Sequence, residues 1–307
     1  MRFPLSRASF ALSLFFLAGV AARCGEAQSA AQTELAESGG PTNGATKEAI
    51  PTATKVLLLA TPPDHPYGSH MYAFDCGVLA RCLRQTPGVT AEYSLGWPSD
   101  ATLWDQLDAV VFYSSPAGEI VLSPEHREKF RQLMRQGVGY SAIHWATSVG
   151  YSKLADDQSL RDEYRRTLGG WFRRPPCDLV ITRTALQQAL PEHPICRGWE
   201  AFELHDEFYL NLVFDERADP LLRIIHDGKP QTVAWTIERD EPAHGRSFGT
   251  VLGHFHENFA RPEFRRFLVN GILWTAHREI PDGGAAVELS DQEVTLPEPA
   301  ATAPAVR

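Results

Sequence analysis

The chain has 307 residues, 43% of them hydrophobic, and a formal net charge of −9 at pH 7. This length and composition suit one enzyme-sized domain with appendages. Acidic residues outnumber Lys plus Arg, and the sequence contains no basic run. A nucleic-acid partner is therefore not expected, because affinity for a phosphate backbone comes largely from clustered Lys and Arg.

The N-terminus has the pattern of a targeting segment. Arg2 and Arg7 precede an uncharged apolar stretch over residues 8–22, and small residues follow. This pattern predicts a signal peptide over residues 1–30 and export to the periplasm or the extracellular space. The stretch is short for a membrane helix, so no stable membrane span is expected after processing. A lipid anchor on Cys24 is the alternative, although Arg23 stands where such signals prefer a small residue.

Two segments have a composition that does not favour folding. Residues 31–54 are rich in Ala, Glu, Thr, Gly and Pro, with almost no large apolar side chain, and residues 281–307 are similar. Such segments cannot bury enough apolar surface to offset the entropy of ordering. The sequence therefore predicts a disordered linker over 31–54, a folded domain over 55–280 and a disordered tail over 281–307.

Within the domain, predicted strands and helices alternate. An apolar strand over 55–60 is followed by a helix over 69–85, a strand over 89–95 and a strand over 107–113. Ser123-Pro124-Glu125 is typical of a helix start, and a strand over 139–144 follows that helix. Weaker strand patterns follow over 178–182, 222–226, 232–237 and 247–253. A final amphipathic helix is predicted over 261–277. The alternation predicts an α/β fold with a doubly wound, mostly parallel sheet.

Two of the predicted strands end at histidines. The run that begins at Gly139 ends at His144, and the run over 247–253 ends directly before His254. A side chain just past a strand end is held rigidly at the rim where open α/β sheets bind ligands. The two strand ends therefore predict one shared site.

Short motifs along the domain identify a family resemblance. They occur in the order Gly68-Ser69-His70, Gly137-Val138-Gly139 with Ile143-His144, Leu168-Gly169-Gly170-Trp171-Phe172, Pro191-Glu192-His193-Pro194-Ile195, Asp206-Glu207-Phe208-Tyr209, Gly253-His254-Phe255-His256 and Asn270-Gly271-Ile272-Leu273-Trp274. Over about residues 55–277 the chain resembles the ThuA-like (trehalose-utilisation) proteins of the class I glutamine amidotransferase-like superfamily. The resemblance implies a flavodoxin-like, three-layer sandwich.

The resemblance also indicates which chemistry to exclude. Amidotransferases of this superfamily carry a nucleophilic cysteine at a strand-to-helix elbow, and the matching position here is expected to be Ile143. The cysteines of the domain lie elsewhere, at Cys76, Cys82, Cys177 and Cys196, and none forms a Cys-x-x-Cys pair. Glutaminase or thiolate chemistry and a structural zinc site of that type are therefore not expected.

The remaining candidates for chemistry are imidazoles and carboxylates. We expect His144, Glu207 and Asp206 to be catalytic. Adjacent residues of an extended segment face opposite ways, so only one of the two carboxylates should reach the site, and Glu207 is favoured over Asp206 as an orienting partner. A divalent metal ion (Zn²⁺, Mn²⁺ or Fe²⁺) is one expectation, and metal-free acid–base chemistry is the other. The expected metal ligands are His70, His144, Glu207, His254 and His256.

Candidate substrate contacts are His70, Trp145 and Tyr209, since an aromatic ring can stack on a sugar. His65 lies in a Pro-rich loop, where a surface position is the more common outcome. The ThuA-like resemblance implies breakdown of sugars through 3-keto intermediates, in which His144 or Glu207 removes a proton next to the carbonyl. The protein is thus expected to be a lyase, hydrolase or isomerase of oxidised sugars.

A non-catalytic sugar-binding or accessory module is the alternative. Hydrolysis of an ordinary glycoside by two carboxylates fits poorly, because Asp206 and Glu207 are adjacent. The expected partner is a small carbohydrate, and a homo-oligomer remains open.

Overall fold

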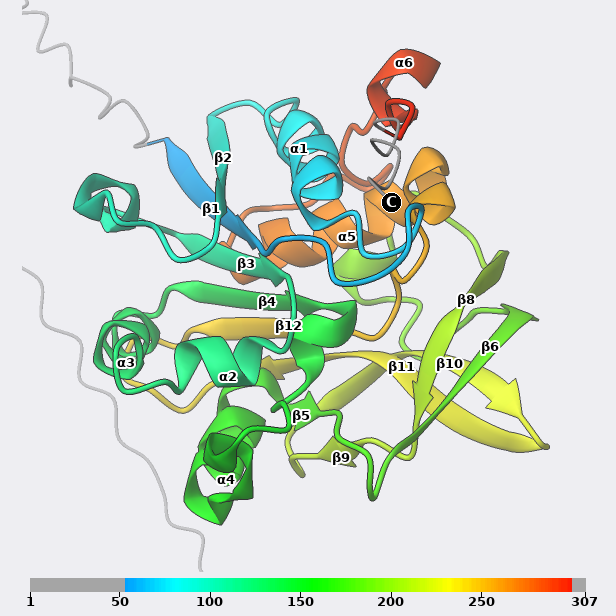
Figure 1. The fold of residues 1–307 in the computed structure, drawn as a ribbon. Coiled ribbons are helices and arrows are strands. Elements are labelled where there is room, and N and C mark those ends of the chain that lie inside the picture. The colour runs from blue at the N-terminus through cyan, green and yellow to red at the C-terminus, as the bar shows by residue number, and fades with distance from the viewer. Residues whose placement is uncertain (1–52, 300–307) are drawn as a thin grey trace, which may run out of the picture. The chain divides into compact units, whose positions relative to one another are not determined.

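The structure, a computed structural model, describes residues 53–299. The predicted signal peptide and nearly all of the predicted linker lie outside the described residues. The helices are α1 (Tyr72–Leu83), α2 (Ala117–Val121), α3 (Arg127–Arg135), α4 (Gln158–Leu168), α5 (Pro262–Thr275) and α6 (Asp291–Val294) (Figure 1). The strands are β1 (Thr54–Ala60), β2 (Val89–Leu95), β3 (Ala109–Tyr113), β4 (Gly139–Ile143), β5 (Gly170–Trp171), β6 (Asp178–Ala185), β7 (Gln187–Gln188), β8 (Glu203–Leu210), β9 (Val213–Phe214), β10 (Asp219–His226), β11 (Lys229–Glu238) and β12 (Arg246–Thr250).

An eight-stranded sheet has the order β2-β1-β3-β4-β12-β11-β10-β7. The first five of these strands run parallel, and β11, β10 and β7 add antiparallel pairs. The parallel strands β1, β3 and β4 are apolar and almost fully buried, as expected where helices cover both faces of a sheet. The prediction of an α/β fold with a mostly parallel, doubly wound sheet is confirmed.

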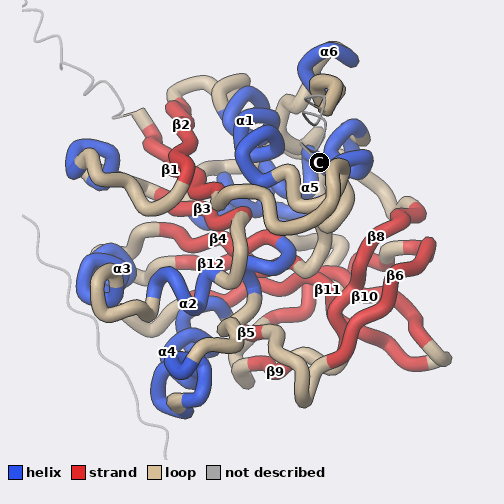
Figure 2. The backbone as a smooth tube through the Cα atoms, viewed as in Figure 1, coloured by secondary structure: helices blue, strands red, loops and turns tan. Residues whose placement is uncertain are grey.

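Helices lie on both faces of the parallel strands, with α1 and α5 on one face and α2, α3 and α4 on the other (Figures 1 and 2). Neighbouring residues of β4 show the two faces. The hydroxyl of Tyr140 lies 2.9 Å from that of Tyr164 in α4, whereas Ser141 Oγ lies 3.3 Å from Thr275 Oγ1 in α5. The alternation of side chains along a strand therefore connects the sheet to both helical layers.

The second half of the domain adds antiparallel structure beside the parallel sheet. Strands β6 and β8 form a two-stranded ribbon, and β5 pairs with β9. The sequence patterns indicated β6 only in part, and they did not predict α2, α4, β5, β7, β8 or β9. The expected helix start at Ser123 was also placed too early, because α3 begins at Arg127 after a turn. The ribbon is important for the site, since β8 carries Asp206 and Glu207.

The prediction of a disordered tail from residue 281 is wrong for residues 281–299. Val287 and Ala285 are buried, and a short helix, α6, follows them. The carbonyl of Val287 accepts hydrogen bonds from the Arg265 side chain at 3.2 and 3.0 Å, and Arg81 donates to the carbonyl of Glu293. A segment of low hydrophobicity is ordered here because arginines of α1 and α5 bind its backbone carbonyls.

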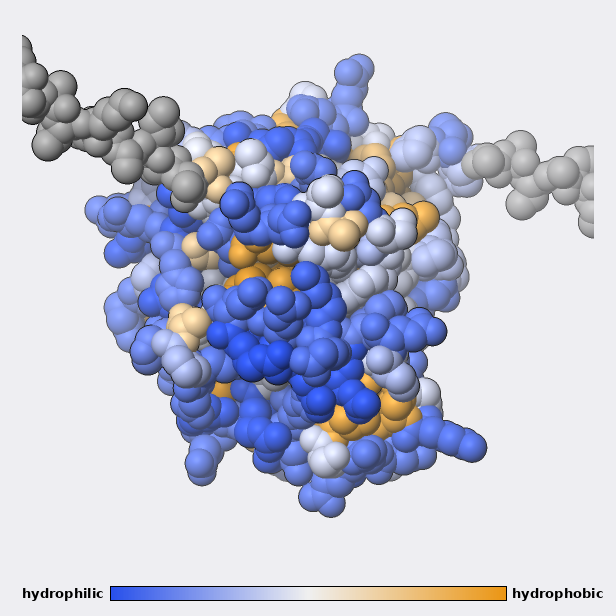
Figure 3. Space-filling view, turned by 90° about the vertical axis from the view of Figure 1, so that its left-hand side faces the viewer, coloured by the Kyte–Doolittle hydropathy of each residue, from blue (hydrophilic) through white to orange (hydrophobic). Residues whose placement is uncertain are grey.

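Polar residues cover most of the face at which the parallel strands begin, with small apolar patches between them (Figure 3). Among residues 53–299, every helix is too short or too polar to span a bilayer.

The first residue of β4 touches the end of α5 at a glycine. A Cβ on Gly139 would lie 2.3 Å from the carbonyl oxygen of Thr275 and 2.5 Å from its carbonyl carbon. Because these are backbone atoms, β4 or α5 would have to move, and we expect Gly139→Ala to lower the free energy of unfolding by about 1–3 kcal/mol. Urea denaturation measures this change.

Gly283→Ala is the matched control, because a Cβ there would meet no atom within 4 Å. We expect that variant to stay within about 0.5 kcal/mol of the parent protein. Equal stability of the two variants would contradict the close packing of β4 against α5.

Candidate active site

Three histidines meet at the carboxyl ends of the parallel strands. His70 lies in the loop between β1 and α1, His144 directly follows β4, and His254 lies shortly after β12. β2 lies on one side of β1 and β3 lies on the other, so the direction in which successive strands are added to the sheet switches between β1 and β3. Ligands of open α/β sheets bind outside the strand ends near such a point. The topology thus brings together residues that are 184 and 110 positions apart.

The three imidazole rings point one nitrogen each toward a common centre. His254 Nδ1 lies 3.1 Å from His70 Nε2 and 3.2 Å from His144 Nε2. All three side chains are buried. The loops are held in place by the backbone, since the amide of His70 donates to the carbonyl of His254 at 3.0 Å.

The outer nitrogens of two rings have fixed acceptors. His70 Nδ1 lies 2.8 Å from Asp64 Oδ1, and His144 Nδ1 lies 2.7 Å from the carbonyl oxygen of Val251. Each of these nitrogens therefore carries the hydrogen, and each Nε2 presents a lone pair. Tyr72 supports the first pair, because its hydroxyl lies 3.2 Å from Asp64 Oδ2.

These three nitrogens are suited to a divalent cation. His254 Nδ1 has at most one hydrogen to donate and faces two lone pairs, one of which, on His144 Nε2, also lies 3.2 Å from the Tyr209 hydroxyl. A tetrahedral zinc ion with Zn–N bonds of about 2.0–2.1 Å separates its ligand nitrogens by about 3.3 Å, close to the two distances from His254 Nδ1. A carboxylate or carbonyl behind a ligating imidazole is also the usual outer-shell partner. His70, His144 and His254 could therefore hold a divalent ion.

Burial keeps these rings neutral in the absence of an ion. It lowers the pKa of His70 to about 2 and that of His254 to about 4, with the charge of His65 adding to both shifts. Burial, followed by the charges of His70 and His254, also holds the pKa of His144 well below its usual value. The lone pairs are consequently free at neutral pH, as metal binding requires.

Glu207 and Asp206, on β8, lie differently. Glu207 Oε1 is 3.9 Å from His144 Nε2 and 3.8 Å from His254 Nδ1, and burial raises the pKa of its carboxyl. Asp206 is fully buried, and its oxygens accept the amides of Gly253 at 2.7 Å and His254 at 2.9 Å. Glu207 thus faces the histidines, whereas Asp206 holds the loop that carries one of them.

His256 does not join the cluster, so its prediction as a metal ligand beside His254 is wrong. Its Nδ1 lies 2.6 Å from Asp75 Oδ1, and its Nε2 lies 2.8 Å from the carbonyl oxygen of Val294. The prediction assumed an extended chain, in which alternate residues share a side. Here a 3-10 turn begins at His256 and directs the ring toward α1.

A cavity of about 250 Å³ opens beside this cluster, and His70 is the member of the cluster that lines it. Its walls include four side chains that the sequence marked as candidates, namely His70, Trp145, Glu207 and Tyr209. The hydroxyl of Tyr209 lies 3.2 Å from His144 Nε2. Five further lining residues were not expected to be part of the site: His65, Tyr151, Phe172, Arg174 and Leu179. Of these, His65 had a signal in the sequence, because Asp64-His65 closely follows the first strand at its carboxyl end.

Comparison with known proteins identifies the family. A family model described as trehalose utilisation, ThuA, matches residues 78–275. The chain belongs to the ThuA family. No curated protein matches the sequence significantly.

One solved structure supports the ThuA-type fold, and two further structures show weaker similarity. A ThuA-like protein from Bacteroides uniformis has 17% sequence identity and a TM-score of 0.54, and the match covers 78% of this chain and 97% of that one. A cytoplasmic protein from Salmonella typhimurium has 16% identity and a TM-score of 0.49, with 72% and 98% covered. A glutamine amidotransferase from Thermotoga maritima has 8% identity and a TM-score of 0.42, with 73% and 98% covered.

The elbow of this ThuA protein is occupied by a histidine. The residue at a sharp strand-to-helix elbow has strained backbone angles, and here that residue is His144, with φ of 56°, whereas Ile143 is extended. The elbow therefore lies one position later than the sequence suggested. It still carries no cysteine, and the four described cysteines are buried free thiols elsewhere, at Cys76, Cys82, Cys177 and Cys196.

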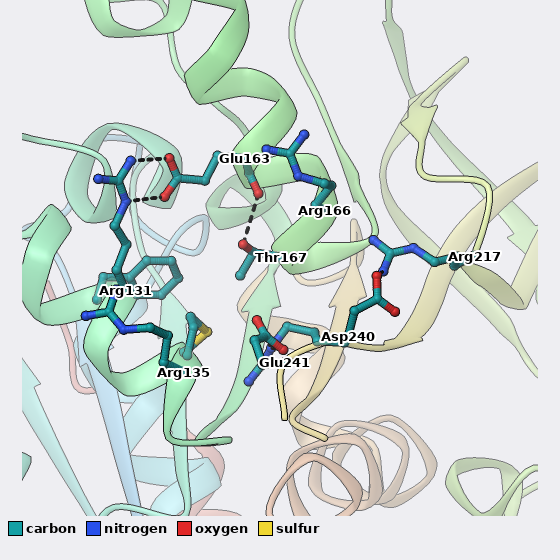
Figure 4. Close-up of a pocket in the computed structure, with 11 residues that line it drawn as sticks. Arg131, Arg135, Glu163, Arg166, Thr167, Arg217, Asp240 and Glu241 are labelled. Atoms are coloured by element: carbon teal, nitrogen blue, oxygen red, sulfur yellow. Dashed lines mark hydrogen bonds and ion pairs between the residues drawn. The ribbon is translucent and has the colours of Figure 1, made fainter. Parts of the chain in front are cut away.

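Another cavity of the ThuA domain, of about 360 Å³, is lined by several arginines (Figure 4). Most of them are already paired. Arg131 binds both carboxylate oxygens of Glu163, at 2.7 and 2.6 Å, and Arg217 pairs with Asp215 and Asp240. Because these charges largely balance one another, the cavity lacks a set of converging nitrogen atoms such as the three inner imidazole nitrogens of the histidine site.

Proposed function

We propose that this ThuA protein is an enzyme that acts on a 3-keto sugar or 3-keto glycoside, with Glu207 as the base and a divalent ion held by His70, His144 and His254. The observation that carries the proposal is the convergence of three imidazole nitrogens beside Glu207, a carboxylate that lines a cavity together with His70. The description of the family as trehalose utilisation supports a sugar as the substrate class.

The proposed chemistry begins with removal of a proton from the carbon next to the keto group. That C–H bond is acidified by the carbonyl, and Glu207 is the carboxylate that lines the cavity. A bound divalent ion supplies a Lewis acid that polarises the carbonyl oxygen. His144 is the weaker candidate for the base, because it is fully buried and both of its nitrogens face other protein groups.

Other side chains of the cavity would bind and orient the sugar. Trp145 and Tyr209 provide aromatic surface, and the cavity volume of about 250 Å³ lies just below the range of about 300–1,000 Å³ that is common for drug-sized ligands. A single sugar ring is therefore the unit that we expect to be enclosed. The predicted signal peptide supports export of the enzyme, and this location is part of the proposal.

Exchange of a substrate proton with solvent tests the proposal directly. The purified protein is incubated with Zn²⁺, Mn²⁺ or Fe²⁺ and methyl 3-keto-glucoside in D₂O. The proton on C2, next to the carbonyl, should be replaced by deuterium. The rate should exceed that of a metal-only control, because a positioned base typically contributes about 10²–10⁴-fold. Proton NMR measures the exchange.

Saturable binding of the keto sugar with neither exchange nor conversion under any of these ions would contradict the enzymatic proposal. That result would favour a sugar-binding or accessory module instead.

A further inference from the structure

A second ionisable side chain lines the same cavity as Glu207. His65 lies on the loop after β1, and its side chain is 33% exposed. Its ring packs 3.7 Å from that of His70 and 5.5 Å from that of Trp145, measured between centroids. His65 is therefore at the solvent side of the cavity, above the buried histidines.

Asp64 sets the orientation of this ring. His65 Nδ1 lies 2.9 Å from Asp64 Oδ1, the same oxygen that accepts from His70 Nδ1. Because a carboxylate accepts hydrogen bonds, Nδ1 of His65 carries a hydrogen. No protein group among the described residues hydrogen-bonds to Nε2, which leaves that atom available to a ligand.

We propose that His65 is the general acid of a 1,2-elimination, which makes the substrate a 3-keto glycoside with an alcohol leaving group. This inference rests on the proposed function. In the reaction, Glu207 takes the proton of C2, the C1–C2 double bond forms, and the C1–O bond breaks. His65 Nε2 gives its proton to the departing oxygen, so that an enone and an alcohol leave.

The proton balance agrees with the environment of the two groups. After transfer, His65 is the neutral Nδ1–H tautomer, which is the form that Asp64 already holds by its hydrogen bond. Water at the open side of the cavity restores the proton on His65 and removes the proton from Glu207. The net change is the movement of one proton from C2 to the leaving oxygen, and no oxidant or reductant is needed.

Other donors in the cavity are less suited to this role. Burial, followed by the charge of Glu207, holds the pKa of Tyr209 well above its usual value, so this hydroxyl is a poor acid. Arg174 pairs with Asp178 at 3.2 Å and does not release a proton at accessible pH. The hydroxyl of Tyr151 accepts the amide of Arg174 at 3.2 Å. The hydrogen of that hydroxyl remains free, but a phenol is a far weaker acid than an imidazolium, so His65 is the best-suited acid among the residues that line the cavity.

The experiment compares two substrates that differ only in the leaving group. Methoxide needs a proton in order to leave, whereas nitrophenolate is a stable anion and leaves without one. For His65→Gln, we expect kcat to fall about 100-fold or more with methyl 3-keto-glucoside and less than about tenfold with 4-nitrophenyl 3-keto-glucoside. Exchange of the C2 proton in D₂O and the metal content should stay close to those of the parent.

His205→Gln is the matched control, because His205 also lies near the site but pairs with Glu257 on the surface. It should leave both substrates unaffected. An equal fall on both substrates in His65→Gln, or no fall on either, would overturn the role of His65 while leaving the proposed function intact. Absence of both C2 exchange and substrate conversion in the parent protein would instead remove the proposed function, and this inference with it.

Discussion

The parent protein is expected to bind a divalent ion in stoichiometric amount, and the His144→Ala variant is expected to lose it. The substitution removes His144 Nε2, which lies 3.2 Å from His254 Nδ1. His70 Nε2 lies 3.1 Å from the same atom of His254. Changes to outer-shell partners of a metal ligand already cost about 10–100-fold in affinity, so loss of a ligand should cost more. Elemental analysis after dialysis, together with Co²⁺ titration followed by visible absorption, measures the effect.

Controls separate loss of the ion from loss of the fold. His254→Ala removes another nitrogen of the cluster and should behave like His144→Ala. His226→Ala alters a histidine at the end of β10, which contacts only Asp227 among acidic side chains, at 3.6 Å, and it should retain the ion. Circular dichroism should show folded protein for all three variants. Stoichiometric metal in His144→Ala, or its absence from the parent after incubation with each ion, would remove the proposed metal centre.

The Glu207→Gln variant is expected to lose turnover while keeping the ion. Glutamine has nearly the same shape as glutamate but cannot take up the substrate proton, so the rate of C2 exchange should fall by about 10²–10⁴-fold. The ion should remain, because Glu207 Oε1 lies 3.9 Å from His144 Nε2 and 3.8 Å from His254 Nδ1, farther than His254 Nδ1 lies from the other two imidazole nitrogens. NMR and elemental analysis on the same preparation measure both quantities.

Glu257→Gln provides the matched control, since this exposed residue pairs with His205 outside the cavity. It should keep both the exchange rate and the ion. Exchange within tenfold of the parent in Glu207→Gln would assign the base to another residue. Loss of the ion together with activity would make Glu207 a ligand instead of a base.

Much of the parallel half of the fold could be predicted from the sequence. The strand predicted over 89–95 matches β2, and those predicted over 55–60 and 139–144 match β1 and β4 within one residue. These strands are buried on both faces or bounded by Gly and Pro, so their patterns are strong. The short strands β5, β7 and β9 have only two residues each, too few for any periodicity.

The candidate site was predictable where it depends on strand ends and unpredictable where it depends on turns. His144 directly follows β4, and His254 lies shortly after β12, so both could be predicted from the ends of strands. His256 was misplaced because its side chain depends on a turn at that residue, stabilised by Asp75 from α1 and the carbonyl of Val294 from the C-terminal segment. These partners are 181 and 38 positions away in the chain, so no local pattern indicates them.

The sequence by itself determined the alternation of strands and helices, the missing cysteine nucleophile and the residue types available for chemistry. The alternation and the residue types depend on local periodicity and composition, and the missing cysteine nucleophile is what the family resemblance implies, so none of them requires knowledge of the contacts. The tertiary structure decided which imidazoles meet, that Glu207 and not Asp206 faces them, that His65 lines the cavity, and that residues 281–299 are ordered. Each of these depends on hydrogen bonds and packing between distant segments, which exist only once the loops after β1, β4 and β12 have come together.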